Sequence, residues 1–183
     1  MGILVTTRAH QLRGLSPPCS SIRAAIAPTE LDTTWRGRLL VGEVHDENAA
    51  ALGGVAGHAG LFGSAPAVGA YARLVLETLH RPTRLGAPWL MRRFLAKSRV
   101  PRSSRALAWD TMLPTSSCGT RLSHASFGHT GFTGTSLWID PARDLYVVLL
   151  SNRVHPTRPA DRDDALRRLR PQVHDAVVAS LDR

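Results

Sequence analysis

Residues 126–152 read SFGHTGFTGTSLWIDPARDLYVVLLSN, and this stretch decides the fold. Leu145–Leu150 is a short, nearly unbroken apolar and β-branched run, which predicts a strand buried on both faces. Thr135–Ile139 alternates in polarity and is followed by the turn sequence DPARD, so these two runs predict a hairpin. Phe127–Thr130 predicts a third strand, joined to the second through GFTG, where two glycines allow a tight turn or the close approach of a ligand. We expect an antiparallel sheet. If the protein has a functional site, we expect it at the GFTG turn.

Two further segments predict helices that cover the sheet. From Pro66 to Leu79 apolar residues recur at helical spacing on one face, and Ser64 supplies an N-cap. From Asp161 a charged helix begins, which Pro171 kinks or restarts. Its later apolar face is predicted to pack on the sheet and consists of Val173, Val177 and Leu181. The predicted fold class is α/β of the α+β type, an antiparallel sheet flanked by helices.

The rest of the chain predicts an arm followed by one domain. Residues 1–25 are polar and have no sustained period, so we expect an irregular N-terminal arm. Residues 26–183 are expected to form a single, partial domain, in which Leu107–Trp109 is a candidate strand. The glycine-rich loop Gly53–Phe62 is predicted to lie beside His129–Gly131, because both segments suit close approach around a ligand.

Length and composition exclude several classes of protein. The chain has 183 residues and 43% hydrophobic content, enough for one core, and no run approaches the roughly 20 apolar residues of a membrane span. The first ten residues do not resemble a secretory signal, so the chain as written is expected to be cytoplasmic. Cys19 and Cys118 do not suggest a disulfide framework, and His45-Asp46-Glu47 lacks the spacing of metal ligands. We therefore expect no metal and no cofactor.

The net charge of +9 and the pI near 11.2 raise the hypothesis of nucleic-acid binding. Lys97 is the only lysine, so 22 of the 23 basic residues are arginines, and they are scattered along the chain. No zinc-finger spacing or aromatic RNA-binding signature accompanies them. We favour an arginine-rich solvated surface over a nucleic-acid partner.

His129-Thr130-Gly131 resembles the third motif of the serine β-lactamase and penicillin-binding-protein family. That motif is usually Lys-Thr-Gly, but it is His-Thr-Gly in some D-alanyl-D-alanine carboxypeptidases and related esterases. The segments IAPTE at 26–30, GGVAGHAGLF at 53–62 and AWD at 108–110 are similar to the later half of the same family. The resemblance covers about residues 17–182.

The resemblance implies hydrolysis of an amide, lactam or ester through an acyl-enzyme, with a small acyl, peptide or ester substrate. It implies a catalytic role for His129, which hydrogen-bonds the substrate or a proton-relay partner, and substrate binding by Thr130 and Gly131. The backbone N–H of Phe132 would donate to the oxyanion. His58, in the glycine-rich loop, is either a further substrate-binding residue or a hydrogen-bonded structural histidine.

Two of the three catalytic motifs of this family are absent from the sequence. Phe94 stands three residues before Lys97, so Ser-x-x-Lys does not occur, and neither Asn48 nor Asn152 completes the second motif. We therefore expect a truncated form that lacks the N-terminal part with the nucleophile helix, is inactive alone and is open to a complementing N-terminal chain. Members of the family are often extracytoplasmic. The alternative is a non-catalytic binding module that uses the retained cleft wall or an arginine-rich, nucleic-acid-binding surface.

Overall fold

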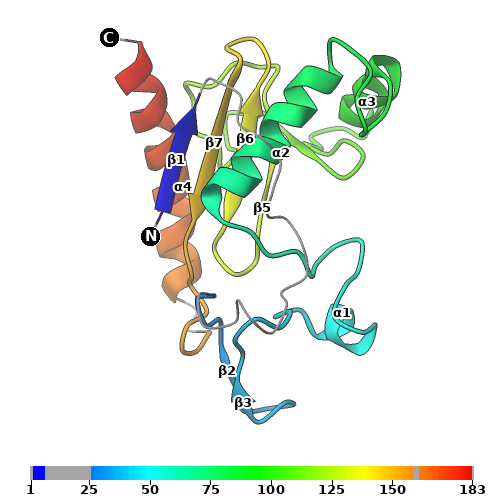
Figure 1. The fold of residues 1–183 in the computed structure, drawn as a ribbon. Helices are drawn as coiled ribbons and strands as arrows, with labels where there is room; N and C mark the ends of the chain where they lie inside the picture. The colour runs from blue at the N-terminus through cyan, green and yellow to red at the C-terminus, as the bar shows by residue number, and fades with distance from the viewer. Residues whose placement is uncertain (1, 7–25, 159–160, 183) are drawn as a thin grey trace.

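The computed structural model describes residues 2–6, 26–158 and 161–182, and its centre is a five-stranded antiparallel sheet (Figure 1). The strand order is β1-β7-β6-β5-β4. The bounds are Gly2–Thr6 for β1, Asp110–Thr111 for β4, Phe127–Thr130 for β5, Ser136–Asp140 for β6 and Leu145–Leu150 for β7. The three strands predicted from the 126–152 stretch are confirmed in type, order and pairing.

A small second sheet and four helices complete the described part of the chain. The second sheet pairs β2, Leu31–Asp32, with β3, Arg38–Leu39. The helices are α1, Glu47–Ala51; α2, Ala65–Thr78; α3, Pro88–Leu95; and α4, Asp161–Leu181. Among the helices described, none is long and apolar enough to cross a lipid bilayer.

Helices cover both faces of the sheet, with α2 in front of it and α4 behind it in Figure 1. The alternation of side chains along β6 and β7 separates the two cores. Ile139, Tyr146 and Val148 pack with the α2 residues Ala72, Val75 and Leu76. On the other face, Trp138 and Leu145 pack with Val178 of α4 and with Met112, Cys118 and Leu122. The predicted burial of β7 on both faces is confirmed, because Leu145–Leu149 are all buried.

The α2 helix has the predicted N-terminal signals. Ser64 adopts an extended conformation, and its hydroxyl oxygen accepts a hydrogen bond from the Ala67 N–H at 3.4 Å. Proline in the first turn has no N–H to leave unpaired there. The helix of Ala65–Thr78 therefore lies within one residue of the prediction at each end.

Two local predictions are wrong at the level of secondary structure. The predicted irregular arm contains β1, which pairs with β7 from Gly2 opposite Leu150 to Thr6 opposite Tyr146, whereas residues 7–25 lie outside the described residues. The short apolar run of β1 pairs with the backbone groups at the edge of β7, which would otherwise be open. Leu107–Trp109 is not a strand, because Ala108 has a positive φ of 63° that breaks the extended conformation, and β4 begins at Asp110.

The face that α4 buries also differs from the prediction. The buried residues lie at intervals of four and are Leu166, Arg170, His174 and Val178. Val173 and Val177 are half-buried, and Leu181 is 50% exposed. The polar residues on the buried face have partners: His174 Nδ1 lies 3.1 Å from the Ser117 carbonyl oxygen, and Arg170 contacts the β5–β6 turn. Hydrogen bonds thus allow a polar stripe to be buried where an apolar one was expected.

Candidate functional site

The turn between β5 and β6 is built around two glycines. The Gly131 N–H donates to the Thr135 carbonyl at 2.7 Å, and the Gly134 N–H donates to the Gly131 carbonyl at 3.1 Å. A Cβ atom on Gly131 would lie 2.2 Å from Thr135 Oγ1, so a larger residue would require the Thr135 side chain to move. Gly134 has a φ of +122°, which favours glycine. The shape of the turn therefore favours the two glycines of GFTG.

Side chains from two other elements fasten this turn. Arg170 of α4 is buried, and its Nη2 donates to the carbonyl oxygens of Gly131 and Thr135, each at 2.9 Å. On the other side, Ser151 Oγ, just after β7, donates to the Gly134 carbonyl at 2.6 Å. The turn is thus held from both the helix and the neighbouring strand.

His129 lies on the exposed side of β5 and has defined polar contacts. Its Nε2 lies 3.0 Å from Arg105 Nη1, and its Nδ1 lies 2.8 Å from the Thr130 carbonyl oxygen. Because a guanidinium can only donate, Nε2 accepts, and Nδ1 therefore carries the proton and donates to Thr130. The imidazole is neutral in this arrangement, and the exposed Arg105 places a positive charge beside it.

The edge of β5 is open beside His129 and Thr130. On one side, β6 pairs with the whole of Phe127–Thr130. On the other side, β4 pairs only with Phe127 and Gly128, and no described strand continues this pairing. An extended ligand can therefore add to the sheet here by backbone hydrogen bonding.

Phe132, the residue after the glycine, is 57% exposed but held on several sides. The His45 ring stacks on it with the ring centroids 5.7 Å apart, and the guanidinium carbons of Arg153 and Arg158 lie 4.2 Å and 5.6 Å from its centroid. Arg153 Nε also donates to the Phe132 carbonyl at 2.5 Å. The Phe132 N–H, by contrast, has no hydrogen-bond acceptor among the described residues.

The groups around Phe132 are connected to a polar rim. Glu30 accepts from Arg158 Nε at 2.6 Å and contacts His45 Nε2 at 2.8 Å. Arg158 Nη2 also lies 2.6 Å from Glu47 Oε1, and this guanidinium lowers the pKa of the Glu47 carboxyl. The rim residues Glu30, His45, Glu47 and Arg158 therefore form one network against the Phe132 ring.

A second ion pair supports the backbone of this rim. Arg36 Nε donates to Asp32 Oδ2 at 2.7 Å, and the same guanidinium donates to the carbonyls of Val44 and His45 at 2.7 and 2.8 Å. Arg36 holds the pKa of the Asp32 carboxyl well below its usual range. Asp32 thus holds Arg36 in place, and Arg36 in turn holds the backbone carbonyl of His45, the residue whose ring stacks on Phe132.

His58 makes a hydrogen bond with a carboxylate next to the rim, as in the structural alternative of the prediction. Its Nε2 lies 3.0 Å from Asp46 Oδ1, and Asp46 caps α1 by accepting from the Ala49 N–H at 2.8 Å. The Ala49 N–H, followed by His58, lowers the pKa of the Asp46 carboxyl. No described contact joins His58 to His129–Phe132, so the position of the Gly53–Phe62 loop beside that segment stays a prediction.

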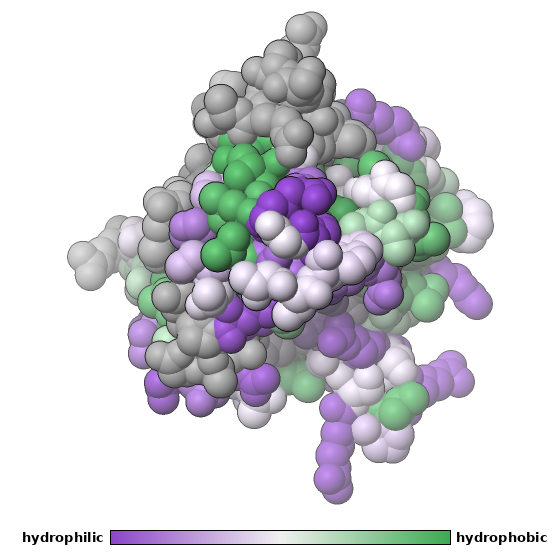
Figure 2. Space-filling model, turned by 90° about the horizontal axis from the view of Figure 1, so that it is seen from below, coloured by the Kyte–Doolittle hydropathy of each residue, from purple (hydrophilic) through white to green (hydrophobic). Residues whose placement is uncertain are grey.

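Figure 1 shows the β5–β6 turn directed toward the end of the molecule that carries β2, β3 and α1. Figure 2 looks onto that end, where hydrophilic side chains gather near the centre and hydrophobic ones lie on either side. Within the described ranges, no three His, Cys, Asp or Glu side chains form a group that could hold a metal ion. Ion pairs with carboxylates occupy the exposed side chains of Arg38, Arg81, Arg143 and Arg158. The nearly buried side chains of Arg36 and Arg73 are paired with carboxylates as well.

The sequence predicted a site at the four consecutive residues His129–Phe132, and that assignment stays a prediction, but it did not predict the side chains that contact them. Arg105, Arg153 and Arg170 were not recognised as site residues, since each comes from a different part of the chain. For Arg170 a signal was present: it stands four residues after Leu166, on the same helical face. A charged residue in an apolar stripe indicates a buried polar contact.

Comparisons with known proteins agree with this geometry. A family model described as Beta-lactamase matches residues 17–172. Putative D-alanyl-D-alanine carboxypeptidases from Escherichia coli O157:H7 and from Escherichia coli strain K12 are 31% and 32% identical to the chain, and each match covers 85% of it. The chain spans 38% of the length of these curated relatives. A crystal structure of a beta-lactamase from Mycobacterium bovis matches with a TM-score of 0.52 and 20% identity, covering 67% of this chain and 46% of that one, which supports the fold.

Proposed function

The chain belongs to the β-lactamase family, and we propose that His129–Phe132 forms the substrate-holding wall of the acyl-transfer site of that family. A peptide or other acyl ligand adds to the open edge of β5 at His129 and Thr130. Its carbonyl oxygen accepts a hydrogen bond from the Phe132 N–H. The observation that carries this proposal is that this N–H has no acceptor among the described residues, while the carbonyl of the same peptide unit, that of Gly131, is held by Arg170 and by the Gly134 N–H.

Each wall residue has a distinct role in the proposal. Thr130 and Gly131 present the backbone along which the ligand lies, with Gly131 keeping the turn tight. His129 faces the ligand from the strand, and Arg105 beside it offers a positive charge to a ligand carboxylate. His58 contacts the ligand from the rim, on the side of α1.

The proposed reaction class is hydrolysis of an amide, lactam or ester through an acyl-enzyme. That reaction needs a serine activated by a base, and Ser-x-x-Lys occurs nowhere in these 183 residues. A positioned donor such as the Phe132 N–H contributes a factor of about 10²–10³, but only when a nucleophile is present. We therefore propose that this chain alone binds acyl ligands without hydrolysing them, and that the nucleophile comes from a separate or preceding segment.

The test compares binding and turnover in the same preparation. N-acetyl-D-alanyl-D-alanine is titrated into the ¹⁵N-labelled chain, and we expect saturable shifts at His129–Phe132. The matched control ligand carries a methyl group on its central amide nitrogen, which prevents strand-like pairing, and should bind more weakly. Incubation with a chromogenic β-lactam, followed by intact mass measurement, should give neither colour nor an adduct.

Two results contradict the proposal in different ways. Equal binding of the methylated peptide, or shifts confined to residues outside the wall, excludes addition to β5. A stoichiometric acyl adduct on any serine shows that the chain contains a working nucleophile and is catalytically complete.

A further inference from the structure

A hollow lies at the opposite end of β5 from the acyl wall. It has a volume of about 450 Å³, within the usual range of roughly 300–1,000 Å³ for small-molecule sites. It is lined by Leu79, Leu95, Lys97, Thr111, Met112, Leu113, Pro114, His124, Ala125, Ser126, Phe127 and Pro141. None of the residues proposed above as the acyl wall contributes to it.

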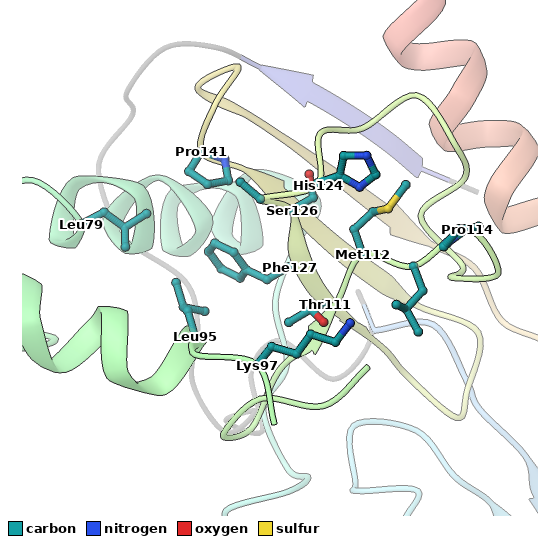
Figure 3. Close-up of a pocket in the computed structure, with 12 residues that line it drawn as sticks. Leu79, Leu95, Lys97, Thr111, Met112, Pro114, His124, Ser126, Phe127 and Pro141 are labelled. Atoms are coloured by element: carbon teal, nitrogen blue, oxygen red, sulfur yellow. The ribbon is translucent and has the colours of Figure 1, made fainter. Parts of the chain in front are cut away.

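Apolar side chains form opposite walls of this hollow (Figure 3). Leu79 after α2, Leu95 at the end of α3 and Phe127 at the start of β5 lie on one side in this view, and Met112 lies on the other. Phe127 and Met112 are buried, so they belong to the fixed core of the domain and not to a mobile surface. Such walls favour the hydrocarbon part of a ligand, because its burial removes apolar surface from water.

The charged groups of the lining are all basic. Lys97 and His124 are both exposed and lie on different sides of the hollow in Figure 3, and no Asp or Glu lines it. Lys97, the only lysine of the sequence, has no ion-pair partner among the residues described. Asp140, next to Pro141, is fully buried and accepts hydrogen bonds from the N–H and Oγ of Ser123 at 2.8 and 2.6 Å. The mouth of the hollow is therefore positively charged.

A buried hydroxyl provides an independent sign of a ligand. Ser126 lines the hollow and is 1% exposed, yet its Oγ has no hydrogen-bond partner in the described part of the chain. Leaving a buried donor unsatisfied is costly, and most buried hydroxyls in proteins are paired. A polar ligand atom that enters the hollow can supply the missing partner.

We propose that this hollow binds a small amphipathic carboxylate. Its hydrocarbon part packs among Leu79, Leu95, Phe127 and Met112. Its carboxylate pairs with Lys97 and accepts the hydrogen bond that Ser126 Oγ otherwise lacks. The site is separate from the acyl wall and does not depend on that wall's function.

Titration of the purified chain with octanoate, followed by NMR and calorimetry, tests the proposal. Octanoate should bind saturably and shift resonances of Phe127 and Met112. Acetate lacks the hydrocarbon part and octanol lacks the charge, so both should bind more weakly. Lys97→Met should weaken octanoate binding about two- to fivefold, as expected for a solvent-accessible ion pair, and leave octanol binding unchanged.

Matched variants distinguish this site from general charge attraction and from the acyl wall. Arg99→Met removes an exposed charge two residues away, outside the lining, and should bind octanoate like the wild type. Ala125→Trp, which places a large ring in the lining, should abolish octanoate binding and leave the binding of N-acetyl-D-alanyl-D-alanine unchanged. The proposal is overturned if octanoate does not reach half-saturation by about 10 mM, a Kd that corresponds to about 3 kcal/mol of binding free energy. It is also overturned if Arg99→Met and Lys97→Met weaken octanoate binding equally. Octanoate shifts confined to His129–Phe132 also overturn it.

Discussion

Arg170→Met tests whether α4 holds the candidate site in shape. Arg170 is 8% exposed, and its Nη2 donates to the carbonyls of Gly131 and Thr135 at 2.9 Å each. A hydrogen bond from a charged donor contributes about 1.5–3 kcal/mol, and we take the lower value because one nitrogen makes both bonds. Methionine keeps most of the aliphatic packing, so the expected loss in the free energy of unfolding is about 3 kcal/mol. That is a large part of the roughly 5–15 kcal/mol of a typical domain.

Urea unfolding followed by circular dichroism measures this loss. With an m-value of about 2 kcal/mol/M, the midpoint should fall by about 1.5 M. Arg168→Met is the matched control, since Arg168 is an exposed arginine on the same helix and should change the midpoint by less than about 0.3 M. Binding of N-acetyl-D-alanyl-D-alanine should also weaken in the Arg170 variant under conditions where it is folded. A stability equal to that of wild type, or an equal loss in the Arg168 control, would refute the reasoning.

Three further changes follow from the described contacts. Gly128→Ala should destabilise by about 3 kcal/mol or more in urea titrations, because its Cβ would lie 2.2 Å from the Leu137 carbonyl oxygen; an unchanged midpoint contradicts this. Burial raises the pKa of the Cys118 thiol to about 12, so peptide mapping after iodoacetamide at pH 8 should find it alkylated only in the unfolded chain. Arg36 lowers the pKa of Asp32, so the ionised Asp32 carboxylate stabilises the folded protein. This contribution is present above about pH 4 and is lost as the pH falls further. The stability difference between wild type and Asp32→Asn should therefore shrink below that pH, and a difference that grows there contradicts the assignment.

The sequence predicted the inner strands well because their signals are local. The β-branched run at Leu145–Leu150, the turn chemistry before it and the alternation in Thr135–Ile139 each act over a few residues. The Ser64 cap and the proline in the first turn likewise allowed the α2 helix to be predicted. In each case the information needed to form the element lies within the element.

The polar contacts of the site could not be predicted because they join distant segments. Arg105 and His129 are 24 residues apart, and Arg158 and Glu30 are 128 apart. The hydrophobic periodicity of the sequence carries no information about such distant pairs. The partners of Arg170 could not be predicted for the same reason, since the carbonyls it binds lie 39 and 35 residues away, although its place on the Leu166 face of α4 was visible in the sequence.

The arrangement around Phe132 bears on how binding and catalysis divide in this protein. His45 and Arg158 contact its ring, and Arg153 holds its carbonyl. The peptide unit that carries its N–H is held through the Gly131 carbonyl by Arg170 and by the Gly134 N–H. All of these contacts come from within the chain, so the orientation of the Phe132 N–H does not require a nucleophile nearby. Electrostatic stabilisation of an oxyanion depends on donors that are fixed before the reaction begins. The proposed wall therefore has its own scaffold within this chain.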